Sequence, residues 1–192
     1  AQIVAGVHCS SALTSFVQGN GIKWINCQFN GASVSPTNPI NLFVTGFLST
    51  CMRGMTFEDC QACNHQGAAA TSITSGFYNL AFDSDSPSAR FSDSDNITYQ
   101  NCIASDIEGA NNTYGFFVGG GNLNIFGTQL VHNNMVLKNC IAERIHSTSD
   151  TAQIAGIAES LSDDLDMFEA LRGSYPLQID LFISDCRVSD VR

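Results

Sequence analysis

Residues 96–104 read NITYQNCIA, and residues 134–142 read NMVLKNCIA. Both stretches carry an Asn-Cys pair with two alternating apolar or aromatic residues before it and an alanine two places after it. The same pattern, with Asn or Asp before the cysteine, is present in GIKWINCQF at 21–29, GMTFEDCQA at 54–62 and DLFISDCRV at 180–188. Five copies of one unit in a single chain predict a solenoid of stacked coils, because each coil needs its neighbours to bury its apolar face.

The alternation inside each copy predicts a strand followed by a bend. Ile97 and Tyr99 are two residues apart, which places both on one face of a strand. The alternation then slips by one residue, so that Cys102 and Ala104 become the next inward positions. Asn and Asp tolerate the left-handed backbone conformation better than other non-glycine residues. We therefore expect a bend, and a ladder of stacked polar side chains, at Asn26, Asp59, Asn101, Asn139 and Asp185.

A second slip and a second motif complete the unit. Ile107 lies three residues beyond Ala104, which breaks the alternation again. A glycine followed by a large apolar residue falls between successive copies, at Gly46-Phe47, Gly76-Phe77, Gly115-Phe116 and Gly156-Ile157. We interpret one coil as a strand, the Asn/Asp bend, a short strand, a second bend and a third strand opened by the glycine.

This arrangement resembles the right-handed parallel β-helix of the pectin-lyase-like superfamily, in which an Asn ladder at a sharp bend recurs. The resemblance covers roughly Ser15 to Arg192 and depends on the repeat. We expect an all-β, right-handed parallel β-helix of about five coils, forming one domain over 1–192 with residues 1–14 as a partial first coil or an end segment.

The cysteines are spaced 33, 42, 38 and 46 residues apart, which is longer than the core coil that the resemblance implies. We therefore expect long loops at 77–95, 116–133 and 157–179, which leave the solenoid at one corner and form a lateral wall. Within the third loop, residues 158–173 space their leucines and a phenylalanine as an amphipathic helix does, so we expect one short inserted helix there.

Eight cysteines are consistent with disulfides, metal ligands or core residues. Five of them, Cys27, Cys60, Cys102, Cys140 and Cys186, fall in the inward column, where cysteine acts as a small apolar residue. The segment CQACNH at 60–65 resembles a zinc site, but the repeat turns Cys60 and Cys63 to opposite faces. We expect free, buried thiols and no metal site.

One loop holds the candidate catalytic residues. Asp83, Asp85, Asp93 and Asp95 surround Arg90, and such a cluster fits a solvated turn, a Ca²⁺ site or an acid–base pair. The resemblance implies Asp-bound Ca²⁺ with a basic residue in lyases, and a Gly-His-Gly with an Arg-x-Lys in hydrolases. The sequence contains neither hydrolase motif. We expect no catalytic residue and no cofactor, with Ca²⁺ as the one alternative.

The charge pattern restricts the partners. The net charge is −10, and the 8 basic residues are scattered singly, so neither nucleic acid nor an anionic membrane is an expected partner. No apolar run reaches the roughly 20 residues of a membrane span, and no signal peptide is visible. Free thiols favour a reducing compartment, while an extracellular or particle surface stays open as a location.

We expect a non-catalytic structural or surface-interaction module, as in a fibre, a shell or an adhesin. Coils at both ends of the sequence, without a capping helix after the last one, favour self-association or binding to other protein subunits. The alternative is a polysaccharide lyase or glycoside hydrolase of the pectin-lyase-like type, with carbohydrate bound in a groove between the lateral loops.

Overall fold

The computed structural model describes residues 2–10, 21–34, 42–50, 54–70, 72–80, 82–83, 90–91, 96–119, 133–160 and 179–192. The strands are β1 (Gln2–Ser10), β2 (Lys23–Ile25), β3 (Gln28–Val34), β4 (Leu42–Thr50), β5 (Thr56–Glu58), β6 (Gln61–Gly67), β7 (Ile73–Leu80), β8 (Phe82–Asp83), β9 (Arg90–Phe91), β10 (Ile97–Gln100), β11 (Ile103–Gly109), β12 (Thr113–Gly119), β13 (Asn133–Lys138), β14 (Ile141–Ser147), β15 (Ile154–Ser160), β16 (Ile179–Ser184) and β17 (Arg187–Val191). No helix lies within these residues.

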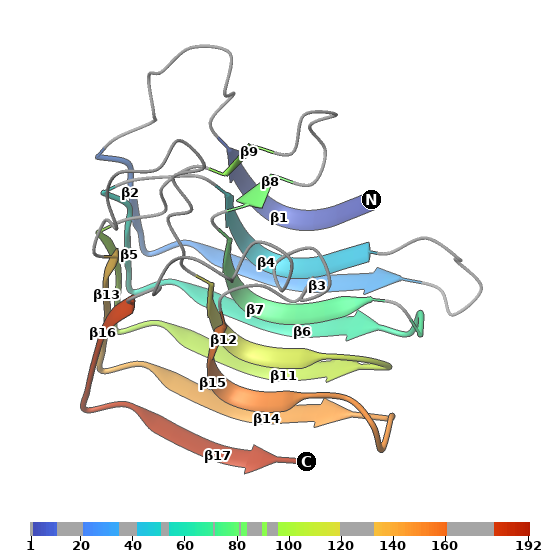
Figure 1. Ribbon diagram of the computed structural model, residues 1–192. Coiled ribbons are helices and arrows are strands. Elements are labelled where there is room, and N and C mark those ends of the chain that lie inside the picture. The colour runs from blue at the N-terminus through green and yellow to red at the C-terminus, as the bar shows by residue number, and fades with distance from the viewer. Residues whose placement is uncertain are drawn as a thin grey trace, which may run out of the picture.

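Fifteen of the strands form three parallel sheets of five strands each. Sheet I contains β2, β5, β10, β13 and β16; sheet II contains β3, β6, β11, β14 and β17; sheet III contains β1, β4, β7, β12 and β15. The chain visits the sheets in turn, and Figure 1 shows the coils stacked from β1 at the top to β17 at the bottom. The predicted all-β parallel β-helix is confirmed.

The bend between sheets I and II has the expected conformation. The five bend residues, Asn26, Asp59, Asn101, Asn139 and Asp185, have φ angles of 53°, 55°, 54°, 53° and 55°. The left-handed residue turns the chain within one position, so that the apolar residues on both sides of the bend face the interior. Asn and Asp are therefore favoured at these positions by the backbone conformation alone, apart from any side-chain hydrogen bond.

The second slip is a kink inside a strand, which corrects our expectation of a second bend between strands. Gly31, Asn64, Asp106, Arg144 and Asp190 also have positive φ, yet each lies within its sheet II strand. The register passes over them, as in the pairing of β11 with β14, where Ser105 pairs with Glu143 and the next pair is Ile107 with Ile145. All five strands carry a kink residue at the same position. The residues on both sides of it therefore stay in register with the neighbouring strands.

The interior is built from columns of like residues. Met55, Ile97 and Met135 are each 0% exposed and line up in sheet I, where Phe57 stacks on Tyr99 at 5.1 Å between ring centroids. A second aromatic column in sheet III contains Phe77 and Phe116 at 4.8 Å, and its rings meet the first column edge to face. Parallel, in-register stacking therefore converts each repeated position into a continuous strip of core.

The glycines of the Gly-Phe motif lie in the middle of the sheet III strands, which corrects the expectation that they open the strand. A Cβ on Gly76 would lie 2.7 Å from the Cβ of Ala104 in sheet II and 2.9 Å from the carbonyl oxygen of Gly115. Gly46 and Gly115 face Ala62 and Ala142 in the same way. Glycine opposite alanine therefore permits close contact between sheets II and III.

Sheet III carries a second apolar cluster on its other face. Leu48, Tyr78, Tyr114 and Phe117 are 3%, 1%, 1% and 1% exposed, and Tyr78 stacks on Phe117 at 4.4 Å. Sheet III therefore buries apolar side chains on both faces, and its strands extend beyond the Gly-Phe pair. Residues 77–80, 116–119 and 157–160, which we expected in loops, are strand. The remaining expected helix residues, 161–173, lie outside the described residues.

We predict that Gly76→Ala lowers the free energy of unfolding by about 1–3 kcal/mol, because the added methyl group collides with backbone and with Ala104. Urea unfolding measures this loss. The control is Gly21→Asn. A Cβ at Gly21 meets nothing within 4 Å, and Gly21 has φ 73°. The equivalent position of another copy of the repeat is Asn96, which has φ 55°, so Asn fits this backbone conformation. The control should differ from wild type by less than about 0.5 kcal/mol; equal losses in both variants would contradict this account.

Candidate functional site

The Asn/Asp column forms a hydrogen-bonded ladder through the middle coils. The side-chain amide of Asn101 donates to Asp59 Oδ1 at 2.9 Å, and that of Asn139 donates to Asn101 Oδ1 at 3.2 Å. Asn26 and Asp185 occupy the two ends of the column with the same backbone conformation. The ladder ties three consecutive coils together at the point where each chain segment turns.

The cysteine column lies directly inside this ladder. Cys60, Cys102 and Cys140 are each 0% exposed, and all five thiols of the column are free. Each thiol from Cys60 onward donates weakly to a carbonyl oxygen of the previous coil, as in Cys102 Sγ to Phe57 O at 3.4 Å and Cys140 Sγ to Tyr99 O at 3.5 Å. The thiol contact with Cys140, followed by burial, raises the pKa of Cys102, and burial raises that of Cys60. Such thiols are poor nucleophiles, because the reactive thiolate is disfavoured.

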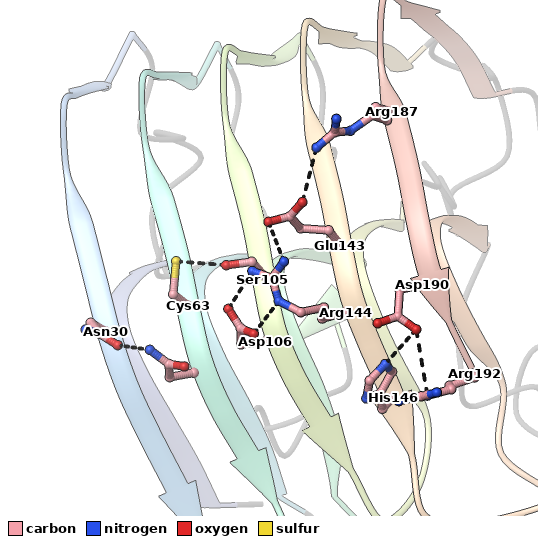
Figure 2. Close-up of polar contacts among 11 residues, drawn as sticks. Asn30, Cys63, Ser105, Asp106, Glu143, Arg144, His146, Arg187, Asp190 and Arg192 are labelled. Atoms are coloured by element: carbon pink, nitrogen blue, oxygen red, sulfur yellow. Dashed lines mark hydrogen bonds and ion pairs between the residues drawn. The ribbon is translucent and has the colours of Figure 1, made fainter.

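The outer face of sheet II carries a set of polar contacts that run across the coils, drawn in Figure 2. We call this surface the polar face; its members are Asn30, Cys63, Asn64, Ser105, Asp106, Glu143, Arg144, His146, Arg187, Asp190 and Arg192. At its N-terminal end the contacts are neutral: Asn64 Nδ2 donates to Asn30 Oδ1 at 2.6 Å, and Ser105 Oγ donates to Cys63 Sγ at 3.3 Å.

Toward the C-terminal end the contacts of the polar face are ionic. Arg144 donates from Nε to Asp106 Oδ1 at 2.5 Å and from Nη2 to Asp106 Oδ2 at 2.9 Å. Glu143 accepts from Arg187 Nη2 at 3.2 Å and lies 2.8 Å from Arg144 Nη1. Asp190 Oδ1 lies 3.3 Å from His146 Nε2 and 3.7 Å from Arg192 Nε. The Arg144–Asp106 and Arg187–Glu143 pairs join neighbouring coils, whereas Arg144–Glu143 and Arg192–Asp190 lie within one coil.

Arg144 is the unusual member of this set, because it adopts φ 56° without being Gly, Asn or Asp. A left-handed conformation costs such a residue roughly 1–2 kcal/mol. The two parallel bonds to Asp106 hold the guanidinium in one geometry and lower the pKa of the Asp106 carboxyl. We conclude that this ion pair, which joins β11 to β14, stabilises the strained backbone.

In the zinc-like segment the cysteines face opposite sides of their strand. Cys60 points inward, whereas Cys63 lies on the polar face and His65 is again inward and 0% exposed. Within the described residues, no three His, Cys, Asp or Glu side chains are grouped so that they could hold a metal ion.

His65 replaces an aliphatic residue in a core column. Its register partners are Ala32 and Ile107, and the Ile107 column continues to Ile145. His65 Nδ1 accepts a hydrogen bond from the Ala32 amide at 3.3 Å, while Nε2 is buried without a partner. Burial lowers the pKa of His65 from 6.5 to about 4. The ring is therefore neutral in the fold at neutral pH.

The candidate catalytic loop is described only in part. Asp83 and Arg90 are register partners across the antiparallel hairpin of β8 and β9, beside the pair Phe82 and Phe91. The hairpin thus brings two of the five sequence-predicted residues together through the backbone. Asp85, Asp93 and Asp95 lie outside the described residues.

Sequence reasoning overlooked the ionic contacts of the polar face and the core position of His65. The signal for His65 was present in the repeat: it aligns with Ile107 and Ile145 once the kink residues are aligned. No local signal marks Asp106 and Arg144 as a pair, because they lie 38 residues apart and meet only through stacking.

No protein family, curated protein or solved structure was found to match this chain. Among the described residues, no helix is long and apolar enough to cross a membrane.

We predict that Asn101→Ala costs about 3 kcal/mol, because it removes two ladder bonds of about 1 kcal/mol each and leaves a non-glycine residue in the left-handed conformation. Asn101→Gly removes the same bonds without the backbone penalty, so we expect about 1–2 kcal/mol. Urea unfolding of the two variants separates the contributions. A loss that is equal in both would show that the backbone conformation is not under strain.

We predict that His65→Ile removes part of the acid sensitivity of the fold. Above pH 6.5 the ring is neutral in both states, and as pH falls toward 4 only the unfolded state binds the proton, which costs wild type about 3 kcal/mol. Urea unfolding between pH 8 and pH 4 should show a shallower loss for His65→Ile than for the Gly21→Asn control. Parallel pH profiles for the two variants would show that His65 does not titrate in this way.

Proposed function

We propose that this protein is a non-catalytic β-helical module whose role is structural, either within a larger assembly or as a surface for binding other proteins. One observation carries the proposal: the thiols, amides and charged groups of the described coils that could perform chemistry form hydrogen bonds and ion pairs with neighbouring coils. The column thiols donate to carbonyl groups one coil away. The Asn/Asp ladder and the charges of the polar face likewise join one coil to the next.

An active site normally requires a titratable group that is both accessible and shifted toward reactivity. None of the shifted groups in the described core is accessible: the contact with Cys102 lowers the pKa of Cys140, but Cys140 is buried. Burial raises the pKa of Cys60 and lowers that of His65, so neither group is charged at neutral pH and both lie inside the core. Asp106 is ionised and is engaged by two bonds from Arg144. These groups support stacking rather than turnover.

Kinship with the pectin-lyase-like proteins is part of this proposal. The parallel coils and the Asn-containing ladder at a sharp bend support it. It carries no activity with it, because function depends on the residues of a site and not on the fold that presents them.

A second candidate function is polysaccharide cleavage at the lateral loops. The observation that favours it is the pairing of Asp83 with Arg90 across β8 and β9, which places a carboxylate residue and a basic residue at one point of a loop. Loop-borne residues of this kind commonly carry function on a rigid scaffold. Backbone pairing in a β-hairpin brings the same two residues together without any catalytic role.

We predict no cleavage of polysaccharides by the 192-residue chain. Acidic polysaccharides are incubated with the protein, with and without Ca²⁺, and unsaturated products and new reducing ends are measured. Wild type should match Arg90→Ala and Asp85→Ala at background level. Product formation that both substitutions abolish would overturn the structural role and establish the lateral-loop enzyme; Ala70→Asp, on an exposed turn, is the control for unspecific loss.

A further inference from the structure

His65 of β6 lies where sheets II and III make their closest contact. A Cβ placed on Gly46 of β4 would lie 2.9 Å from His65 Nε2. One coil further on, a Cβ on the equivalent glycine, Gly76, would lie 3.0 Å from the Cδ1 methyl group of Ile107. The imidazole nitrogen therefore occupies the place that a methyl group fills in the next coil.

The hydrogen bond of His65 fixes the position of its proton. Nδ1 accepts from the backbone amide of Ala32 at 3.3 Å, so the neutral ring carries its proton on Nε2. Nε2 is buried and has no hydrogen-bond partner among the described residues. The neutral ring thus makes one hydrogen bond and leaves one donor unsatisfied, a cost that Ile107 and Ile145 avoid at the same position of the column.

The surroundings of the ring do not compensate a positive charge. Its neighbours on other strands are Phe29 and Ala32 of β3, Gly46 of β4 and Ile107 of β11. These neighbours contain no titratable or charged side chain. Cys63 and Asn64 of the same strand lie on the polar face, on the other side of sheet II. Burial is accordingly the cause that lowers the pKa of His65.

We propose that protonation of His65 opens the fold locally, at the contact of β6 with β3 and β4, and leaves the coils that carry isoleucine at this position closed. The chain thus contains a pH-sensitive switch. This inference goes beyond the proposed function, because it applies equally to a structural module and to a module that binds other proteins.

Protonation removes the hydrogen bond that the ring makes in the closed state. The second proton goes to Nδ1, where it faces the amide hydrogen of Ala32, so that two donors oppose each other. Nε2 already lacks an acceptor among the described residues. The cation is then buried without a partner on either nitrogen, which costs far more than a buried neutral ring. Exposure of the ring to water restores its hydration but takes it out of the contact with Gly46.

The opening is local because the ionisable group belongs to one coil. The column of His65 continues through Ile107 and Ile145, which bind no proton. In the coils of these two residues, Gly76 and Gly115 pack on alanine as Gly46 does. Stacked coils interact with their nearest neighbours, and an opening of one unit requires less free energy than unfolding of the whole stack.

The closed and open states bind a proton at different pH. In the open state the exposed ring has the ordinary pKa of 6.5, and in the closed state burial lowers it to about 4. The closed state is fully favoured above pH 6.5 and loses this advantage as pH falls toward 4. Between pH 7.5 and pH 5 the open fraction should rise about 30-fold, while most carboxyl groups remain ionised.

Amide hydrogen exchange followed by NMR at pH 7.5 and pH 5 tests the switch residue by residue. Protection factors, which correct for the pH dependence of intrinsic exchange, should fall about 30-fold at Ala32 and at Ala68, whose amide donates to Val34 O at 3.3 Å. Ile141 of β14, whose amide donates to Cys102 O at 2.9 Å, should change by less than about threefold.

Three variants, with folding verified by circular dichroism, identify the group responsible. His65→Gln keeps a side-chain acceptor for the Ala32 amide and cannot titrate, so the acid response at Ala32 should be lost. His65→Ile matches the rest of the column and is read at Ala68, because Ala32 loses its acceptor in this variant. His146→Gln is the matched control: it removes a histidine of the polar face, beside Asp190, and should keep the full response.

Loss of protection at Ala32 and Ala68 that spares Ile141, disappears in both His65 variants and persists in His146→Gln supports the switch. Unchanged protection of wild-type Ala32 at pH 5, or a His65→Gln variant that responds as wild type does, overturns it. Equal loss of protection at Ala32 and Ile141 also overturns it, because the acid then unfolds the whole stack and no local opening exists.

Discussion

Five described coils of this protein turn at an Asn or Asp whose φ lies between 53° and 55°, and the stacking of these residues controls the remainder of the described fold. The left-handed residue reverses the inward and outward alternation within a single position. Without it, the cysteine column after the bend would face solvent and the alternating residues before the bend would have no core to complete. The side chains that permit this conformation also bond to each other from coil to coil, so one residue type satisfies both the backbone and the stack.

A second constraint sets the distance between sheets II and III. In three coils, the glycine in the middle of the sheet III strand lies against an alanine of sheet II. A Cβ added to this glycine would lie within 2.7 Å of the alanine Cβ. This close contact leaves little room for a cavity or a buried cofactor between the two sheets. Larger side chains are concentrated instead where sheets I and III meet, in two aromatic columns packed edge to face.

Repetition also distributes polar chemistry along the stack. Neighbouring coils place like positions beside each other, so a charge at one position meets whatever the next coil carries there. On the polar face this produces Arg144 against Asp106 and Arg187 against Glu143. Buried His65 shows the opposite case, since its neighbours in the column are apolar and its ring must remain neutral. Stacking thus explains both the paired charge of Arg144 on the polar face and the neutral ring of His65 in the core.

The sequence by itself determined the fold class, the position and conformation of the bend, and the membership of the inward columns at Cys102, Ala104 and their equivalents. It could do so because those features are local, recur in five copies and depend on alternation and on the tolerance of Asn and Asp for positive φ. Only the tertiary structure decided that the second slip is a kink within a strand, that glycine lies inside its strand, and that Asp106 meets Arg144. These features depend on which residues of different coils come to lie side by side, and loops of unequal length conceal that register in the linear sequence.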